Sequence, residues 1–125
     1  MSSIKQPEEL KLIQEGGQRM GAILAKLAKM AAPGVTLLQL DTEAERLILE
    51  AGGVPAFKGY KARAGDTPFP STICACVNEE LVHAPGNRDR ALQISDILSI
   101  DIGMRWPVKD GFFTDTALTI ALGPV

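Results

Sequence analysis

Two long apolar segments, residues 96–106 and 112–123, are the feature that most constrains how this chain folds. In each segment apolar residues alternate with small or polar ones, which is the pattern of a β-strand with one buried face. The segments are separated by a short turn-like stretch, residues 107–111, so together they predict an antiparallel hairpin. The residues predicted to face the core are Leu98, Ile100, Ile102, Leu118, Ile120 and Leu122.

Two aspartates, one on each strand, lie on the other face of this predicted hairpin. If the turn centres on Val108, Asp101 and Asp115 are directly opposed, with side chains about 5 Å apart. Like charges at that distance repel, and a hard divalent cation between the carboxylates would remove the repulsion. The alternative is a register that differs by a residue or two, with one carboxylate solvated. We predict that both carboxylates share one face, with Asp101 opposite or diagonal to Asp115.

An amphipathic helix is predicted near the start of the chain. Pro7 suits its first position, two glutamates follow in the first turn, and Pro33-Gly34 ends it. Apolar or small residues recur along it in steps of three and four. Glycines at positions 16, 17 and 21 lower the helix propensity, so we expect them to mark close approach to another element.

A second amphipathic helix begins after Thr36, which forms a capping-box pattern with Gln39, and ends at Gly52-Gly53. Short strands are predicted at 54–57, 71–78 and 81–83. The segments at 58–68 and 84–90 contain the glycine, proline and polar residues typical of exposed loops. The predicted fold class is α+β, with two amphipathic helices packed on one face of an antiparallel or mixed sheet.

Composition narrows the function classes. The length of 125 residues suits a single domain, residues 1–125. The net charge of −2, without a basic run, gives no sign of a nucleic-acid partner, and no apolar stretch is long enough to cross a membrane. Cys74 and Cys76 are two apart on a predicted strand, where a disulfide between them would be strained. With no secretory signal at the start, we expect a reduced, cytoplasmic protein.

His83 is the single histidine of the chain and follows an apolar segment at the start of a Pro/Gly loop. An imidazole there is suited to proton transfer near neutral pH or to donating a hydrogen bond to a substrate carbonyl. The alternative is an ordinary loop histidine. No GxSxG elbow and no Gly-rich phosphate loop is present in the sequence, so serine-nucleophile and nucleotide-binding schemes are poorly supported.

The motifs PGVT, FPSTIC, VNEELVHAP, SIDIG and DGFFTDTA follow one another in the chain. This order resembles the first half of the type I methionine aminopeptidases, and the resemblance runs through essentially the whole sequence. It implies half of a pita-bread fold, in which two pseudo-symmetric α+β halves enclose a dinuclear metal site. The family's protein ligands at that site are two aspartates, one histidine and two glutamates.

The resemblance implies specific roles for residues of this chain. Asp101 and Asp115 match the two aspartate ligands, and His83 matches the histidine that contacts substrate and assists catalysis. The positions that correspond to the methionine side-chain pocket of the family are Phe57, Tyr60, Phe69 and Cys74. The segment KARAGDT stands as an insertion in the loop between them.

The implied activity is metal-dependent removal of N-terminal methionine from peptides and nascent proteins. Oxygen-rich ligation fits Mn, Co, Fe(II) or Mg without choosing among them. The chain departs from the family pattern, because it matches two of the five ligands and ends at Val125, about where the family enters its second half. In addition, Ala84 stands where the family usually has glycine.

Three interpretations follow from that departure. The first is a half-domain that forms a homodimer, in which two copies of the Asp101/Asp115 pair face one another. The second is a fragment whose missing C-terminal half supplies the rest of a working aminopeptidase. The third is a non-catalytic half-domain that binds metal, peptide termini or protein partners.

Overall fold

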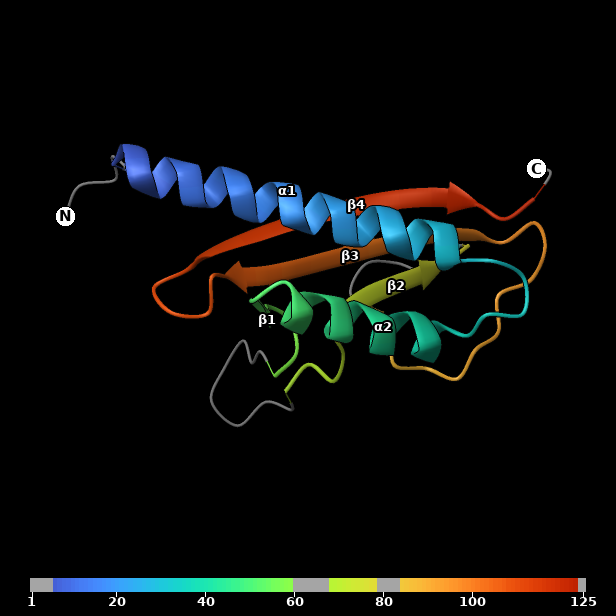
Figure 1. Cartoon of the computed structure of the whole chain (residues 1–125). Helices are drawn as coiled ribbons and strands as arrows, with labels where there is room; N and C mark the ends of the chain where they lie inside the picture. Colours follow the sequence, from blue (N-terminus) through green and yellow to red (C-terminus); the bar gives the residue numbers. More distant parts are fainter. Residues whose placement is uncertain (1–5, 60–67, 79–83, 124–125) are drawn as a thin grey trace.

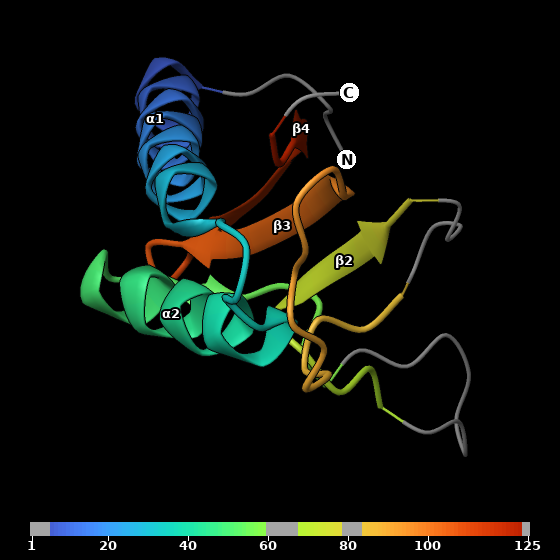
Figure 2. The same ribbon diagram turned by 90° about the vertical axis from the view of Figure 1, so that its right-hand side faces the viewer.

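The computed structural model describes residues 6–59, 68–78 and 84–123. Within these ranges two helices cover one face of a four-stranded antiparallel sheet (Figure 1). Figure 2 shows both helices on the same side of the sheet. The elements are α1 (Pro7–Met30), α2 (Leu37–Glu50), β1 (Val54–Pro55), β2 (Ile73–Val77), β3 (Ile97–Trp106) and β4 (Phe112–Ala121). The α+β prediction is confirmed, and the sheet is antiparallel throughout.

Helix α1 lies over β3 and β4. Its buried apolar residues are Met20, Ile23, Leu24 and Leu27, which recur at helical spacing and face the sheet. The expectation about its glycines is correct at one position. Gly16 is buried, and a Cβ there would lie 3.5 Å from the ring of Trp106, whereas a Cβ at Gly17 or Gly21 would meet nothing within 4 Å.

Helix α2 lies over β1 and β2, and its predicted start is confirmed. The Gln39 amide donates to Thr36 Oγ1 at 3.1 Å, and the Thr36 amide donates to Gln39 Oε1 at 2.8 Å. These reciprocal bonds satisfy two backbone donors at the helix end. The buried face of α2 is apolar except for one carboxylate, Asp41.

Strand β3 lies at the centre of the sheet. Strand β4 pairs with one edge of β3 along its whole length, while β1 and β2 pair with the other edge. The strands predicted at 54–57 and 71–78 are shorter than expected, since only 54–55 and 73–77 pair with β3. Residues 84–90 form the loop that the sequence predicted, apart from a single bridge between Pro85 and Cys74. The third short strand, at 81–83, lies outside the described residues.

The hairpin of β3 and β4 has the predicted faces but not the register given by a turn at Val108. Leu98 pairs with Ile120, and Ile100 pairs with Leu118, so the apolar residues meet beneath the helices. Trp106 pairs with Phe112, which leaves residues 107–111 as the connecting loop and places the turn centre at Lys109.

Asp101 therefore pairs with Ala117, and Asp115 pairs with Gly103. Direct opposition of the two aspartates is wrong, whereas the prediction that they lie diagonally on one face is confirmed. The physical reason is that alternation fixes which residues share a face, and a slip of two positions leaves those faces unchanged.

Candidate functional site

A pocket of about 650 Å³ lies on the sheet face that points away from the helices. It is built from the segment after β1, the segment before β2, and the outer faces of β2, β3 and β4. Its lining residues are Ala56, Phe57, Phe69, Cys74, Asp101, Phe113, Thr114 and Asp115. Aromatic side chains thus stand beside two carboxylates in one cavity, which is the combination of apolar surface and few polar groups typical of a ligand site.

The structure brings together most of the site residues that the sequence predicted. Phe57, Phe69 and Cys74 line the same pocket as Asp101 and Asp115, although they come from separate segments of the chain. Tyr60 and His83 lie outside the described residues.

Three lining residues were missed, namely Ala56, Phe113 and Thr114. Phe113 lies two positions before Asp115 and therefore points to the same face, so the alternation of the strand carried a signal for it. Its side chain is 71% exposed, which makes it the most exposed large apolar residue among those described. Ala56 carried no such signal, because it is a small residue in a short irregular segment next to Phe57.

Cys74 and Asp101 are directly paired across β2 and β3. Burial, together with the negative charge of Asp101 and the nearby Cys76, raises the pKa of the Cys74 thiol to about 11. The thiol is therefore protonated at neutral pH and is suited to packing against a ligand. It does not present the thiolate that a metal ion would bind.

The pocket contains the type of ligand that a hard cation prefers, but only two such side chains are among its described lining residues. Asp101 and Asp115 supply carboxylate oxygens, which Mn²⁺ or Mg²⁺ prefers as ligands. Among the residues that the structure describes, no cluster of three or more His, Cys, Asp or Glu side chains is placed to hold a metal ion. The two carboxylates therefore fit a hard cation in their chemistry, as two of its ligands.

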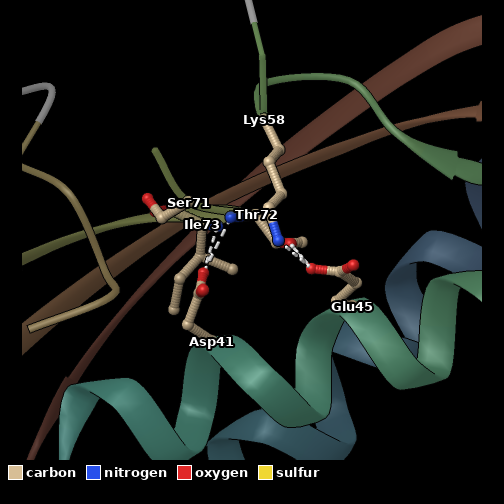
Figure 3. A network of polar contacts seen from close by, with 6 residues as sticks. All are labelled: Asp41, Glu45, Lys58, Ser71, Thr72 and Ile73. Carbon is tan, nitrogen blue, oxygen red and sulfur yellow. Dashed lines mark hydrogen bonds and ion pairs between the residues drawn. The ribbon is translucent and has the colours of Figure 1, made fainter. Parts of the chain in front are cut away.

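A polar network lies between α2 and the start of β2, next to Cys74 in the chain (Figure 3). Asp41 Oδ1 accepts hydrogen bonds from the backbone amides of Thr72 and Ile73 at 2.8 and 2.9 Å. Desolvation raises the pKa of Asp41 above its ordinary value, while the two amide bonds and Lys58 act in the opposite direction. The sequence signal for this residue was a single acid within the apolar stripe of the second helix.

A protein-family model for metallopeptidase family M24 matches residues 11–125. The chain belongs to this family. Membership in M24, a metallopeptidase family, implies the use of divalent metal. In the described part of the chain, neither helix is long and apolar enough to cross a bilayer.

Curated relatives of this M24 chain are named methionine aminopeptidases. It is 36% identical over 125 residues to the enzyme of Clostridium acetobutylicum, a match that covers 100% of this chain and 46% of the relative. It is 39% identical over 122 residues to methionine aminopeptidase 1 of Bacillus subtilis, covering 97% and 45%. The chain thus spans about half the length of the curated relatives that it matches.

Solved structures agree with the sequence comparison. Methionine aminopeptidase from Rickettsia prowazekii superposes with a TM-score of 0.86 at 25% identity, covering 100% of this chain and 46% of that structure. The enzyme from Thermotoga maritima gives a TM-score of 0.84 at 29% identity, covering 98% and 46%. These neighbours are pita-bread enzymes, so the fold of this M24 chain corresponds to about half of that architecture.

Proposed function

We propose that this chain supplies the aspartate ligands and the side-chain pocket of a methionine aminopeptidase, acting on the N-termini of peptides and nascent proteins. The observation that supports this proposal is that Asp101 and Asp115 line one pocket together with Phe57, Phe69 and Cys74. An apolar cavity beside two carboxylates suits a substrate that has an apolar side chain next to a free amine.

The site residues predicted from the sequence each have a proposed part in binding. Asp101 and Asp115 hold the divalent metal, which when bound polarises a peptide carbonyl and acidifies water. Phe57, Phe69 and the protonated Cys74 thiol enclose an unbranched thioether side chain, which adapts to irregular apolar space. His83, which lies outside the described residues, is proposed to donate to or accept a proton from the substrate.

The direct test is the release of methionine from a Met-Ala-Ser peptide by the purified chain with added Mn²⁺ or Co²⁺. We expect slow release, well below that of a complete enzyme, which stops when a chelator is added and in Asp101→Asn. Release that persists in both Asp101→Asn and Asp115→Asn would contradict the proposal and indicate a contaminating aminopeptidase. Metal and peptide binding without release would favour the non-catalytic half-domain.

The outer face of β4 supports a further part of the proposal, that the site is completed by another polypeptide. Within the described ranges β4 pairs only with β3, and its outward residues Phe113, Asp115 and Ala117 are exposed. Large exposed apolar side chains beside a functional site are typical of covered surfaces. We propose a homodimer through this face, with a separate C-terminal half as the alternative occupant.

Self-association is expected to depend on Phe113. Multi-angle light scattering at high micromolar concentration should give the mass of a dimer for the parent chain, and closed twofold dimers are the commonest assembly of identical chains. Phe113→Ser removes the exposed ring and should shift the mass toward that of a monomer. Ile94→Ser, at an exposed apolar residue outside the strands, is the matched control and should leave the dimer intact. A monomer in the parent chain would contradict the homodimer.

A further inference from the structure

One helix contacts two segments of the pocket from behind without lining it. Asp41 is 5% exposed, and its Oδ1 atom binds two consecutive backbone amides, those of Thr72 and Ile73. The next residue along the chain is Cys74, which lines the pocket and is paired with Asp101. Asp41 thus holds the residue directly before a pocket-lining side chain, and Figure 3 shows its contact with Ile73.

Glu45 lies one helical turn after Asp41 and binds residues next to two pocket-lining segments. Its Oε1 atom accepts from Lys58 Nζ at 2.6 Å and from Thr72 Oγ1 at 3.2 Å. Lys58 directly follows Phe57, which lines the pocket. The carboxylate therefore joins the segment that carries Phe57 to the segment that leads into Cys74.

Ser71 and Gly86 make the start of β2 more rigid. Ser71 Oγ donates to the carbonyl of Ile73 at 2.6 Å and accepts from the Gly86 amide at 3.0 Å. A Cβ at Gly86 would lie 2.4 Å from Ile73 Cγ1, so the 84–86 segment packs closely on β2. Backbone polar groups at this strand end are therefore satisfied by side chains, as a buried strand terminus requires.

Burying the carboxylate of Asp41 is unfavourable in free energy. A carboxylate taken out of water is penalised unless its hydrogen bonds offset the lost hydration. Here desolvation, with a smaller contribution from the charge of Glu45, outweighs the two amide bonds and the attraction of Lys58, because the pKa of Asp41 stays above its ordinary value. Polar groups retained at such a cost often fix one arrangement of neighbouring segments rather than add stability.

We propose that Asp41 and Glu45 are positioning residues that set the width of the pocket. Asp41 fixes the segment that carries Cys74, and Glu45 fixes the segment that carries Phe57, so the spacing of the two along α2 determines how far apart these pocket residues lie. This positioning role rests on the proposed function in one respect, namely that the group bound in the pocket is the side chain of a substrate.

The first test measures the accessibility of Cys74 in the full chain, in a Cys76→Ser background, by its rate of alkylation with iodoacetamide. Asp41→Ala removes the acceptor for both amides, and we expect alkylation to be faster by about fivefold or more as the strand end loosens. Asp41→Asn is also neutral but keeps an Oδ1 acceptor, so it should stay within about twofold of the parent.

A matched control distinguishes the positioning effect of Asp41 from the general effect of removing a negative charge from α2. Glu43→Gln weakens the ion pair with Arg46, 2.6 Å long, on the exposed side of α2 and should leave the alkylation rate unchanged. An Asp41→Ala chain that is folded by circular dichroism but alkylates at the parent rate would overturn the role of Asp41. Equal acceleration in Asp41→Asn and Asp41→Ala would overturn it as well.

Glu45→Ala keeps the proposal testable if Asp41→Ala fails to fold. Glu45 is partly exposed, and alanine suits a helix interior, so this variant should fold. We expect faster hydrogen exchange at the amides of Ala56 and Gly59, which bond Gly103 and Phe69 respectively, with exchange in α2 unchanged. Unchanged exchange at both amides would overturn the role of Glu45.

A peptide-binding measurement then distinguishes a failure of the positioning role of Asp41 from a failure of the proposed substrate, methionine. If the pocket holds methionine, the preference for Met-Ala-Ser over Phe-Ala-Ser should fall about tenfold in Asp41→Ala and be restored in Asp41→Asn. Failure of the parent chain to bind either peptide would count against the proposed function. The alkylation and exchange results would still decide the positioning role, since neither depends on a substrate.

Discussion

Replacing either Asp101 or Asp115 by asparagine is expected to weaken the binding of divalent metal to this chain strongly. The two carboxylates line one pocket and are the acidic residues that the structure places there. An amide oxygen is neutral and a weaker ligand than a carboxylate, so the loss of one ligand from so small a set should lower affinity by about tenfold or more. Isothermal titration with Mn²⁺ measures the effect.

The hairpin loop offers a matched control for this experiment. Asp110 is exposed, lies on the same hairpin and has a positive φ of 57°, a conformation that asparagine tolerates well. Asp110→Asn makes the same change in charge and should bind Mn²⁺ with the affinity of the parent chain. His83→Ala should also keep most of the affinity for Mn²⁺, while its rate of turnover falls. The same affinity in Asp115→Asn as in the parent would show that the metal site is elsewhere.

Gly111→Ala is expected to cause a large loss of stability. A Cβ at this position would lie 1.8 Å from the carbonyl oxygen of Pro107 and 2.7 Å from the carbonyl carbon of Trp106. Both neighbours are backbone atoms, so the turn must open to admit a methyl group. We expect the free energy of unfolding to fall by about 2–4 kcal/mol, within the range of strongly destabilising substitutions.

Gly17→Ala is the control for this change. A Cβ at Gly17 would meet nothing within 4 Å, on an exposed position of α1, so alanine should raise stability by about 0.5–1 kcal/mol. Denaturation with urea measures both variants. A Gly111→Ala chain as stable as the parent would mean that the loop between β3 and β4 is not held in the conformation described.

Gly111→Ala should also weaken metal binding. The loop sets the register in which Asp115 pairs with Gly103 and lies diagonal to Asp101. A shift of one residue would turn the Asp115 side chain to the opposite face of the sheet, where it would meet the helices. Metal affinity and stability should therefore fall together in this variant.

The sequence predicted which residues share each face of the hairpin, because the alternation of apolar and polar residues specifies the faces directly. The sequence did not predict the register of the two strands, because pairing Asp101 with residue 115 or with residue 117 buries the same side chains. The loop decides between these registers through the close approach of Gly111 to Pro107, which depends on three-dimensional geometry. The capping box at Thr36 was predictable because it is local.

The pocket was predictable only in part. Periodicity does not connect Phe57 and Phe69 with Asp101, because irregular segments bring them together, and resemblance to a family supplied that link. The role of Asp41 could not be predicted, because its partners Thr72 and Ile73 are about thirty residues away and bind through backbone amides that leave no mark on the sequence.

The most direct test of the metal site is anomalous diffraction from crystals of the chain grown with Mn²⁺. The site proposed here predicts a manganese peak in the pocket, in contact with carboxylate oxygens of both Asp101 and Asp115. A peak at any other position, with both of these carboxylates free of metal, would contradict the proposed centre.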